Sequence, residues 1–254
     1  MLKIKQLPVL NDNYIYLIVD KKTQITACVD PALAEPVIKY LNKENLSLNF
    51  ILNTHHHFDH VGANLELKKK YGCKIVGNKK DSDRIPGIDI KLNENDFFAI
   101  GQSKCKVIDV SGHTKGHIAF YFKEEDLIFC GDTLFSLGCG RLFEGTPAQM
   151  VKSLLKIRSL PNNTKIYCAH EYTLNNANFA LSLDPKNLKL KEKIVEIKKK
   201  RSKNIPTVPC YLGEEKDLNP FLMFDNKKYL MRIGLQNSTK EENFRIIRGM
   251  KDNF

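Results

Sequence analysis

Four histidines and one aspartate fall within six consecutive positions of this chain, in the segment Thr54-His55-His56-His57-Phe58-Asp59-His60. The apolar run Phe50-Ile51-Leu52 before the segment predicts a buried strand, and the apolar spacing after it predicts a helix over about 60–71. The segment therefore lies where a strand ends and a helix begins. In α/β architectures that edge of the sheet is where ligands bind.

The spacing of these side chains indicates metal binding. Imidazole and carboxylate groups are common ligands of zinc-like metals. His55 and His57 are two residues apart, so on extended chain both rings face one metal, whereas His56 faces away. Asp59 and His60 lie past the turn and can face a second metal. Five ligand-type side chains exceed the three that one catalytic ion takes, which suggests two metals. The alternative is a His-rich surface turn that binds metal by accident.

Three further ligand-type residues, His113, Asp132 and His170, each follow a predicted strand. Alone, each would suggest a packing or capping role. Together with the cluster they complete two ligand sets, and Asp132 has two oxygens with which to bridge them. The expected sets are His55, His57 and His113 for one ion, and Asp59, His60 and His170 for the other. His117, at the start of the next strand, is expected to shape the loop through a hydrogen bond.

The pattern of apolar residues predicts strands and helices mixed through residue 170, then helices with no further strand. Turn residues such as Gly72 and the Thr146-Pro147 helix start mark boundaries between the elements. We expect a domain of residues 1–170 and a helical domain of residues 171–254. The expected strands are 2–7, 14–20, 25–30, 49–53, 74–77, 88–92, 96–100, 104–110, 118–122, 127–130 and 166–169, and the further helices are 34–45, 147–159, 175–183, 186–202 and 239–249.

The composition is that of a soluble globular protein, with 42% hydrophobic and 27% charged residues and no apolar run long enough to span a bilayer. The N-terminus lacks the apolar region of a signal peptide. The seven cysteines include no Cys-x-x-Cys pair and are too sparse for a disulfide scaffold. Four of them have apolar neighbours, which indicates buried thiols in a reducing compartment: Cys28, Cys105, Cys130 and Cys168. We therefore expect a cytoplasmic protein without a membrane partner. Cys139 lies in a Gly-Cys-Gly segment near a possible site, but packing explains it as well as reactivity does.

The net charge of +11 favours anionic partners. Its densest patch is the run Lys198-Lys199-Lys200-Arg201-Ser202-Lys203, which we interpret as the solvated end of a helix. No aromatic residues are interleaved with it, so no nucleic-acid partner is expected.

The motif His-x-His-x-Asp-His, followed by a distant His, Asp and His at strand ends, resembles the metallo-β-lactamase superfamily. That resemblance implies an α/β fold, a four-layer αβ/βα sandwich in which two mixed sheets face each other, helices lie outside and metals bind at one edge. Superfamily members cleave lactams, thioesters, phosphodiesters and lactones, so the motif alone leaves the substrate open.

Several other segments are similar to the glyoxalase II (hydroxyacylglutathione hydrolase) family, and they extend through the helical part of the chain. They are Asn11-Asp12-Asn13-Tyr14, Gly131-Asp132-Thr133-Leu134-Phe135, residues 138–145, His170-Glu171-Tyr172-Thr173, Pro206-Thr207-Val208-Pro209, Asn219-Pro220-Phe221 and residues 248–254.

This resemblance implies glutathione contacts from Tyr172, Arg248 and Lys251. Arg248 and Lys251 are three residues apart, so on a helix they share a face on which two cations suit the carboxylates of glutathione. Arg141 and Phe143 stand where animal members have lysine and tyrosine, as in bacterial members. Arg141 keeps the cation, whereas Phe143 lacks the hydroxyl.

The implied reaction is hydrolysis of S-D-lactoylglutathione to D-lactate and glutathione, the second step of methylglyoxal detoxification. Two divalent ions, zinc by preference and iron or manganese as alternatives, would activate water. Asp59 and Asp132 would hold the attacking hydroxide. The expected partner is a small glutathione thioester, and the protein is expected to be a monomer.

Three other readings stay open at this point. One is another hydrolase of the superfamily, such as a lactonase, a β-lactamase or an RNA-processing nuclease. Another is a persulfide dioxygenase with a single iron, which the second ligand set disfavours. The third is a metal-buffering or nucleic-acid-binding module, which leaves the strand-end positions of His113, Asp132 and His170 unexplained.

Overall fold

The computed structural model describes residues 1–236 and 238–254, which divide into two compact units. The first unit comprises residues 1–109 and 115–131, and the second comprises residues 110–114 and 132–254. The short segment 110–114 is thus the only part of the second unit that precedes residue 131 in the chain.

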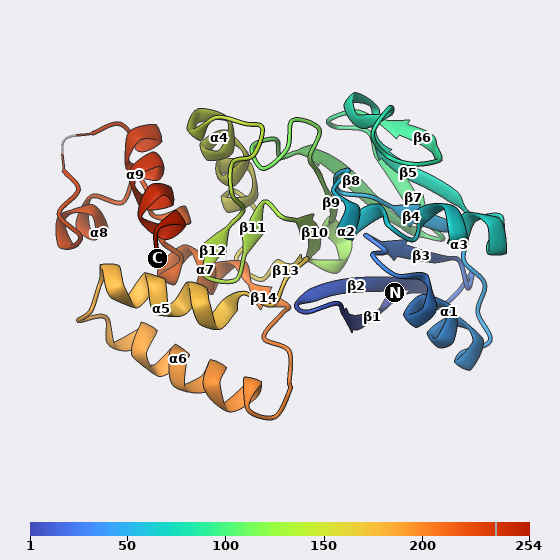
Figure 1. Cartoon of the computed structure of the whole chain (residues 1–254), viewed down its shortest axis with the longest axis horizontal. Coiled ribbons are helices and arrows are strands. Elements are labelled where there is room, and N and C mark those ends of the chain that lie inside the picture. The colour runs from blue at the N-terminus through green and yellow to red at the C-terminus, as the bar shows by residue number, and fades with distance from the viewer. Residues whose placement is uncertain (237) are drawn as a thin grey trace. The chain divides into compact units, whose positions relative to one another are not determined.

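Six strands of the first unit form one mixed sheet in the order β1-β2-β3-β4-β5-β6 (Figure 1). β1 to β3 are antiparallel, and β3 to β6 are parallel. Every residue of β2 is buried, which agrees with its nearly unbroken apolar sequence. The strands are β1 (Leu2–Val9), β2 (Asn13–Asp20), β3 (Thr26–Val29), β4 (Phe50–Leu52), β5 (Lys74–Asn78) and β6 (Ile88–Leu92).

Two helices cover one face of this sheet, α1 (Ala34–Lys43) and α3 (Asn64–Tyr71) (Figure 1). Val37 and Leu41 of α1 and Leu67 of α3 belong to one buried cluster with apolar residues of the strands. Their spacing of four residues places Val37 and Leu41 on one face of α1, so the amphipathic pattern of the sequence accounts for the packing.

The other four strands of the first unit form an antiparallel meander, in which β7 pairs with β8, β8 with β9 and β9 with β10. These strands are β7 (Phe97–Ile100), β8 (Ser103–Asp109), β9 (Ile118–Phe122) and β10 (Leu127–Gly131). Aromatic rings join the meander to the first sheet. Phe50 packs edge-on against Phe98 at 5.0 Å between ring centroids, and Tyr16 lies 5.4 Å from Phe129. The core of this unit therefore lies between two sheets.

The helix predicted over residues 60–71 is wrong as a single element. The structure has α2 (Phe58–Val61) and α3, with a break at Gly62 and Ala63. The Ala63 N–H donates to the Pro31 carbonyl at 2.9 Å, outside the helix. A Cβ on Gly62 would lie 2.7 Å from the Ala32 carbonyl oxygen, so the close backbone approach requires glycine. The predicted end at Gly72 is confirmed, with φ of +66°.

The second unit consists mostly of helices, of which α5 and α6 lie side by side (Figure 1). Thr146 caps α4 in a capping box with Gln149, which confirms the predicted start at Pro147. The elements are β11 (Leu134–Phe135), β12 (Gly138–Cys139), α4 (Pro147–Arg158), β13 (Lys165–Cys168), α5 (Thr173–Leu183), α6 (Leu188–Arg201), β14 (Cys210–Tyr211), α7 (Leu212–Leu218), η3 (Pro220–Leu222), α8 (Lys227–Arg232) and α9 (Lys240–Asp252).

The prediction that no strand follows His170 is wrong, because β14 pairs antiparallel with β13 through Lys165–Tyr211 and Ile166–Cys210. Two-residue strands such as β11, β12 and β14 are too short to show the alternation that identifies a strand in a sequence. The short helices α7 and α8 lie between residues 202 and 239, where the sequence predicted no helix. The other predicted elements are present within a few residues of their expected ends.

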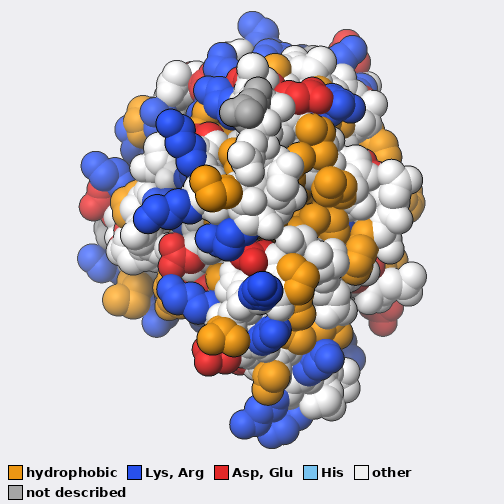
Figure 2. Space-filling view, turned by 90° about the vertical axis from the view of Figure 1, so that its left-hand side faces the viewer, with side chains coloured by type: hydrophobic (Ala, Val, Ile, Leu, Met, Phe, Trp, Pro, Cys, Tyr) orange, Lys and Arg blue, Asp and Glu red, His pale blue; other side chains and the backbone are white. Residues whose placement is uncertain are grey.

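The run of basic residues forms the last turn of α6, where cations are favourable beside the helix carbonyls. Lys200 pairs with Glu196 at 2.6 Å on the same helix. Figure 2 shows Lys and Arg side chains spread over one face, with acidic and apolar side chains among them. No helix within residues 1–236 and 238–254 combines the length and apolar character needed to cross a membrane.

Candidate active site

The cluster of histidines in the first unit follows β4, as the sequence predicts: His55, His56 and His57 lie on the loop before α2, and His60 lies within α2. The His55 and His57 rings are 4.6 Å apart, and the His55 and His60 rings are 4.0 Å apart, between centroids. Ligand nitrogens of His55 and His57 lie within 4.8 Å of each other. His60 Nε2 is 3.5 Å from Asp59 Oδ2, and Asn13 donates to the same carboxylate oxygen at 2.8 Å. Imidazoles and a carboxylate are thus gathered in one small volume.

A buried carboxylate, that of Asp30, holds this loop through hydrogen bonds. Asp30 accepts hydrogen bonds from the Thr54 backbone N–H at 2.8 Å and from the Thr54 hydroxyl at 2.7 Å. Asp30 Oδ2 is also 3.0 Å from His60 Nδ1. Because a carboxylate only accepts, His60 carries its proton on Nδ1, and its lone pair is on Nε2.

The hydrogen bonds of Thr54 determine which ring nitrogen of His55 carries the proton. The Thr54 hydroxyl gives its hydrogen to Asp30, so at 3.1 Å it accepts from Nδ1 of His55. The lone pair of His55 is then also on Nε2. A metal-binding histidine commonly has one ring nitrogen held by the protein in this way, so that the other faces the metal.

Two histidines of the first unit have other contacts. His56 Nδ1 is 3.3 Å from the buried Asp81, and His56 Nε2 is 3.3 Å from Arg84. Both ring nitrogens of His56 therefore face protein groups. His117 stacks on His55, with ring centroids 4.5 Å apart and planes 17° apart. Its position supports the His55 ring by packing, a contact that the sequence did not indicate.

The second unit holds the remaining three ligand-type residues, and they meet at Asp132. His113 follows β8, Asp132 follows β10 and His170 follows β13. Asp132 Oδ2 is 3.5 Å from His113 Nε2, and Oδ1 is 3.3 Å from His170 Nε2. The two carboxylate oxygens thus face different imidazoles. His113 Nδ1 donates to the Arg141 carbonyl at 2.8 Å, which again leaves the lone pair on Nε2.

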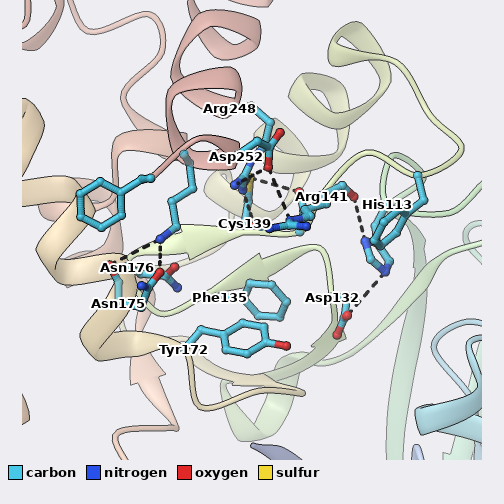
Figure 3. Close-up of a pocket in the computed structure, with 14 residues that line it drawn as sticks. His113, Asp132, Phe135, Cys139, Arg141, Tyr172, Asn175, Asn176, Arg248 and Asp252 are labelled. Atoms are coloured by element: carbon cyan, nitrogen blue, oxygen red, sulfur yellow. Dashed lines mark hydrogen bonds and ion pairs between the residues drawn. The ribbon is translucent and has the colours of Figure 1, made fainter.

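A cavity of about 550 Å³ opens beside His113 and Asp132 in the second unit. In Figure 3 these two residues lie at one end of the cavity, and Asn175 and Asn176 lie at the other. All five residues that the sequence assigned to substrate line this cavity, Arg141, Phe143, Tyr172, Arg248 and Lys251. Cavities of this volume accommodate small-molecule ligands.

Arg248 is buried in the cavity wall on α9. Its Nη1 donates to the Cys139 carbonyl at 2.8 Å, and its Nη2 is 3.0 Å from Asp252 (Figure 3). Its guanidinium also lies 4.9 Å from the centre of the Phe221 ring. Nε of Arg248 is buried without a hydrogen-bond partner within the part of the chain that the structure describes. The guanidinium is therefore held in place with a donor to spare.

Lys251 follows on the same face of α9 and is half-buried between Phe179 and Phe254. Its ammonium donates to the Asn175 side-chain oxygen. Burial, together with the neighbouring Arg248 and Arg141 cations, lowers the pKa of Lys251 to about 8. An anion in the cavity would relieve that repulsion, so the site favours negatively charged ligands.

An aromatic floor lines the cavity near Asp132. The Tyr172 ring stacks on the His170 ring at 4.8 Å with planes 2° apart. Phe135 contacts both rings edge-on, at 5.8 Å from His170 and 5.3 Å from Tyr172. Phe143 packs edge-on against His113 at 5.1 Å. Aromatic side chains thus flank both histidines of this unit.

Cys139 lines the cavity behind Arg248, but its environment argues against a nucleophile. Burial raises the pKa of the Cys139 thiol to about 11. A thiol in that state is protonated at neutral pH and reacts slowly. All seven cysteines are buried and none belongs to a disulfide within the described residues, which agrees with the burial that the sequence predicted for Cys28, Cys105, Cys130 and Cys168.

Sequence reasoning missed several residues of the cavity wall, Phe135, Asn175, Asn176, Asp252 and Phe254. Helical spacing offered one signal. Asn175 and Asn176 lie three and four residues beyond Tyr172, and Asp252 lies four beyond Arg248, so each shares a helix face with a residue already assigned.

Comparisons with known proteins agree with the fold. The family model of the metallo-beta-lactamase superfamily matches residues 12–170, and the model of the hydroxyacylglutathione hydrolase C-terminus matches residues 171–254. A "Hydroxyacylglutathione hydrolase" of Methylococcus capsulatus is 48% identical over 254 residues, covering 100% of this chain and 99% of the relative. Another of the same name, from Pelagibacter ubique, is 49% identical over 253 residues and covers 100% of both chains.

Solved structures show the same fold. ETHE1 from Myxococcus xanthus has a TM-score of 0.68 at 22% identity, covering 97% of this chain and 96% of that one. TTHA1623, solved in a di-iron-bound form, has a TM-score of 0.56 at 27% identity, covering 66% of this chain and 91% of that one. The predicted metallo-β-lactamase fold with a C-terminal helical domain is confirmed. The chain belongs to the hydroxyacylglutathione hydrolase (glyoxalase II) family of the metallo-β-lactamase superfamily.

Proposed function

We propose that this chain hydrolyses the thioester of S-D-lactoylglutathione, and of related S-2-hydroxyacylglutathiones, to the 2-hydroxy acid and glutathione. Full-length relatives at 48–49% identity carry the name hydroxyacylglutathione hydrolase. The observation that carries the proposal is the cavity of the second unit. At one end it has His113 and Asp132, and its wall carries three cationic side chains, Arg141, Arg248 and Lys251. A glutathione thioester has carboxylates for the cations and a scissile bond for the other end.

We propose that two divalent metal ions act with these residues. The support is the chemistry of the donors: His55, His60 and His113 each have Nδ1 held by a protein group, which leaves Nε2 for a metal. Asp132 turns one oxygen toward each of two imidazoles, as a bridging carboxylate would. One relative of this fold was solved with two irons.

The proposed ligand sets are those expected from the sequence, with zinc preferred and iron or manganese possible for the same donors. They are His55, His57 and His113 for one ion, Asp59, His60 and His170 for the other, and Asp132 between them. When bound, such ions lower the pKa of water toward neutrality and polarise the carbonyl of the substrate.

The residues of the chain supply the rest of the reaction. Asp59 and Asp132 accept hydrogen bonds from the attacking water and so fix its orientation toward the carbonyl carbon. Arg248 and Lys251 hold the glutathione carboxylates, with Arg141 as a third cation. Tyr172 and Phe143 flank the bound thioester. The glutathione thiolate leaves without a strong general acid, because thiol pKa values lie near 8.5.

We further propose that residues 1–170 form the catalytic domain and residues 171–254 the glutathione-binding domain. The two family models meet at this boundary. Tyr172, Arg248 and Lys251 lie beyond it, whereas six of the seven proposed ligands lie before residue 170 and the seventh is His170 itself. The proposal includes a monomeric state, which size-exclusion chromatography tests. It also includes action in the cytoplasm, where buried cysteines persist as thiols without forming disulfides.

One assay tests the function. Purified protein is mixed with S-D-lactoylglutathione, the loss of thioester absorbance in the ultraviolet is followed, and metal is counted on the same sample. We expect hydrolysis with two metal ions per chain. No hydrolysis by a fully metallated sample would refute the proposal, and one iron per chain with consumption of oxygen and glutathione persulfide would indicate a persulfide dioxygenase.

A further inference from the structure

The wall of the cavity contains a hairpin with a strained turn. β11 and β12 are antiparallel and are joined by Ser136 and Leu137. Leu137 has φ of +57°, a left-handed conformation that non-glycine residues adopt rarely and only where their surroundings hold them. The groups that hold this turn therefore control the shape of the β11–β12 hairpin (residues 134–139).

A buried acid on α7 holds the turn. Glu215 is 1% exposed, and its two oxygens accept from the Ser136 hydroxyl at 3.1 Å and from the Leu137 backbone N–H at 2.7 Å. Burial raises the pKa of Glu215 to about 7. Placing an ionisable group in such an environment costs free energy unless its hydrogen bonds compensate. Burial of Glu215 therefore costs free energy, which its hydrogen bonds to the hairpin offset.

Asn219, four residues after Glu215, also binds the hairpin, and we call Glu215 and Asn219 together the clamp. Its side-chain amide donates to the Phe135 carbonyl at 3.2 Å and the Gly138 carbonyl at 3.0 Å, one on each strand of the hairpin. It also lies 2.9 Å from Glu215 Oε2, so the two residues act as one network. Asn176 donates to the Ser136 carbonyl at 3.0 Å from the other side.

The hairpin in turn holds the principal cation of the cavity. Gly138 leads directly to Cys139, whose carbonyl accepts from Arg248 Nη1 at 2.8 Å. A shift of the hairpin would move that carbonyl and leave the buried guanidinium without its main-chain partner. Glu215 and Asn219 line none of the cavity themselves, so any effect on the ligand passes through the hairpin.

We propose that Glu215 and Asn219 are positioning residues for substrate binding, which fix the β11–β12 hairpin and through it the guanidinium of Arg248. This inference rests on the proposed function. It assigns to α7 and η3 a role in ground-state recognition of the glutathione part, separate from the groups at the Asp132 end. Loss of either residue should therefore raise KM and leave kcat and metal content nearly unchanged.

The kinetic test compares Glu215→Ala and Asn219→Ala with matched controls. Glu214→Ala changes the neighbouring acid, which pairs with Lys193 instead of the hairpin. Asn226→Ala removes an asparagine that caps α8 as Asn219 caps η3, without a bond to the hairpin. We expect KM for S-D-lactoylglutathione to rise about tenfold in the two test variants and to stay within about twofold in the controls. Glu215→Gln keeps an acceptor for the Leu137 N–H and should restore KM to within about twofold of the wild type.

A second readout does not depend on catalysis. Cys139 is buried under Arg248, so its alkylation rate reports opening of the hairpin, with Cys28 of the first unit as an internal reference. In Glu215→Ala we expect Cys139 to react about tenfold faster and Cys28 at an unchanged rate.

Folded, metallated Glu215→Ala and Asn219→Ala proteins with wild-type KM would overturn the inference. So would loss of kcat and metal at unchanged KM, because the hairpin would then position Asp132 instead. If the wild type cleaves no glutathione thioester, the proposed function fails, and an unchanged Cys139 rate in both variants would separately disprove the clamp. If Glu215→Ala does not fold, the KM and the Cys139 alkylation rate of Asn219→Ala decide the question.

Discussion

The histidine loop of the first unit and the cavity of the second unit are built in opposite ways. Residues 55–60 place four of the proposed ligands within six positions of the sequence. One buried carboxylate, Asp30, orients two of these ligands: His55 through Thr54, and His60 directly. In the cavity, Arg248 meets Cys139 across 109 positions of the chain, and Asp132 meets two histidines from different strand ends. The chemistry of a local motif can be recognised in the sequence, whereas the residues of a cavity are brought together only by the fold.

The largest effect is expected from the ligands, and the loop offers a matched pair of neighbours. His57→Ala should lose metal and fall in activity by roughly 10³-fold, because the Lewis-acid contribution is several kcal/mol. His56→Ala should keep metal, since its ring nitrogens contact Asp81 and Arg84. Metal counts and kcat/KM on both variants check this.

Asp132→Ala extends the comparison to the second unit, in which Asp132 contacts both His113 and His170. It should lose metal and activity as severely as His57→Ala. A metal-free Asp132→Ala protein with full turnover would show that the metal proposal is wrong, and equal losses in His56→Ala and His57→Ala would show that the alternation along the loop does not select ligands.

Asp30 should have the next largest effect, because it acts on ligands without touching the metal. Asp30→Asn leaves an amide in place of the acceptor for His60 Nδ1 and the Thr54 hydroxyl. Outer hydrogen-bond partners of metal ligands typically contribute 10- to 100-fold in metal affinity, so we expect a loss of about that size. Competition with a chelator measures it. Unchanged affinity would mean that the loop keeps its geometry without the carboxylate.

The same contrast explains how much of the structure the sequence could predict. Regular periodicity identified the long strands and helices, and residue types at strand ends identified all seven proposed ligands. Prediction from the sequence failed where the position of a residue depends on tertiary contacts. Glu215 stands among Glu214, Lys216 and Asp217 and looks like part of a solvated face, yet it is almost fully buried. Only the position of the β11–β12 hairpin gives that carboxylate its partners.

The five residues that we propose to contact substrate could be predicted only through the family resemblance. Nothing in the spacing of Arg141, Tyr172 and Arg248 indicates that they line one cavity, because they come from a loop, the residue before α5 and α9, which are far apart in the chain. The break between α2 and α3 shows the converse. The apolar spacing was helical throughout, but the bond from Ala63 to Pro31 overrode it.

Arg248→Ala tests the proposed substrate binding by the cavity, as His57→Ala tests the proposed metal binding by the histidine loop. Loss of a buried, charged donor should raise KM about 10- to 100-fold and change kcat little, since the contact is to the glutathione part. Arg248→Lys should recover only part of this, because one ammonium cannot replace a guanidinium that bonds Cys139 and Asp252 together. Arg245→Ala, on the same helix but exposed and paired with Glu242, is the control and should leave KM unchanged.

The smallest effect expected is a pH dependence from Lys251. Its pKa is lowered from 10.5 to about 8, so its ammonium is lost as pH rises through about 8. Above that pH the free enzyme attracts an anionic substrate less, and kcat/KM, which reports the free enzyme, should fall a few-fold, roughly the value of one exposed ion pair. Stability should move the opposite way. Between pH 8 and 10.5 the unfolded chain binds more protons than the folded one, so the free energy of unfolding rises with pH.

Comparison with Lys251→Met isolates this one group from every other titration in the site. The ratio of wild-type to variant kcat/KM should be constant below about pH 7 and should decline toward one above pH 8, whereas the gain in wild-type stability over the same range should be absent from the variant. A ratio that does not change between pH 7 and 9.5 would mean that Lys251 keeps its charge and that Arg141 and Arg248 do not repel it.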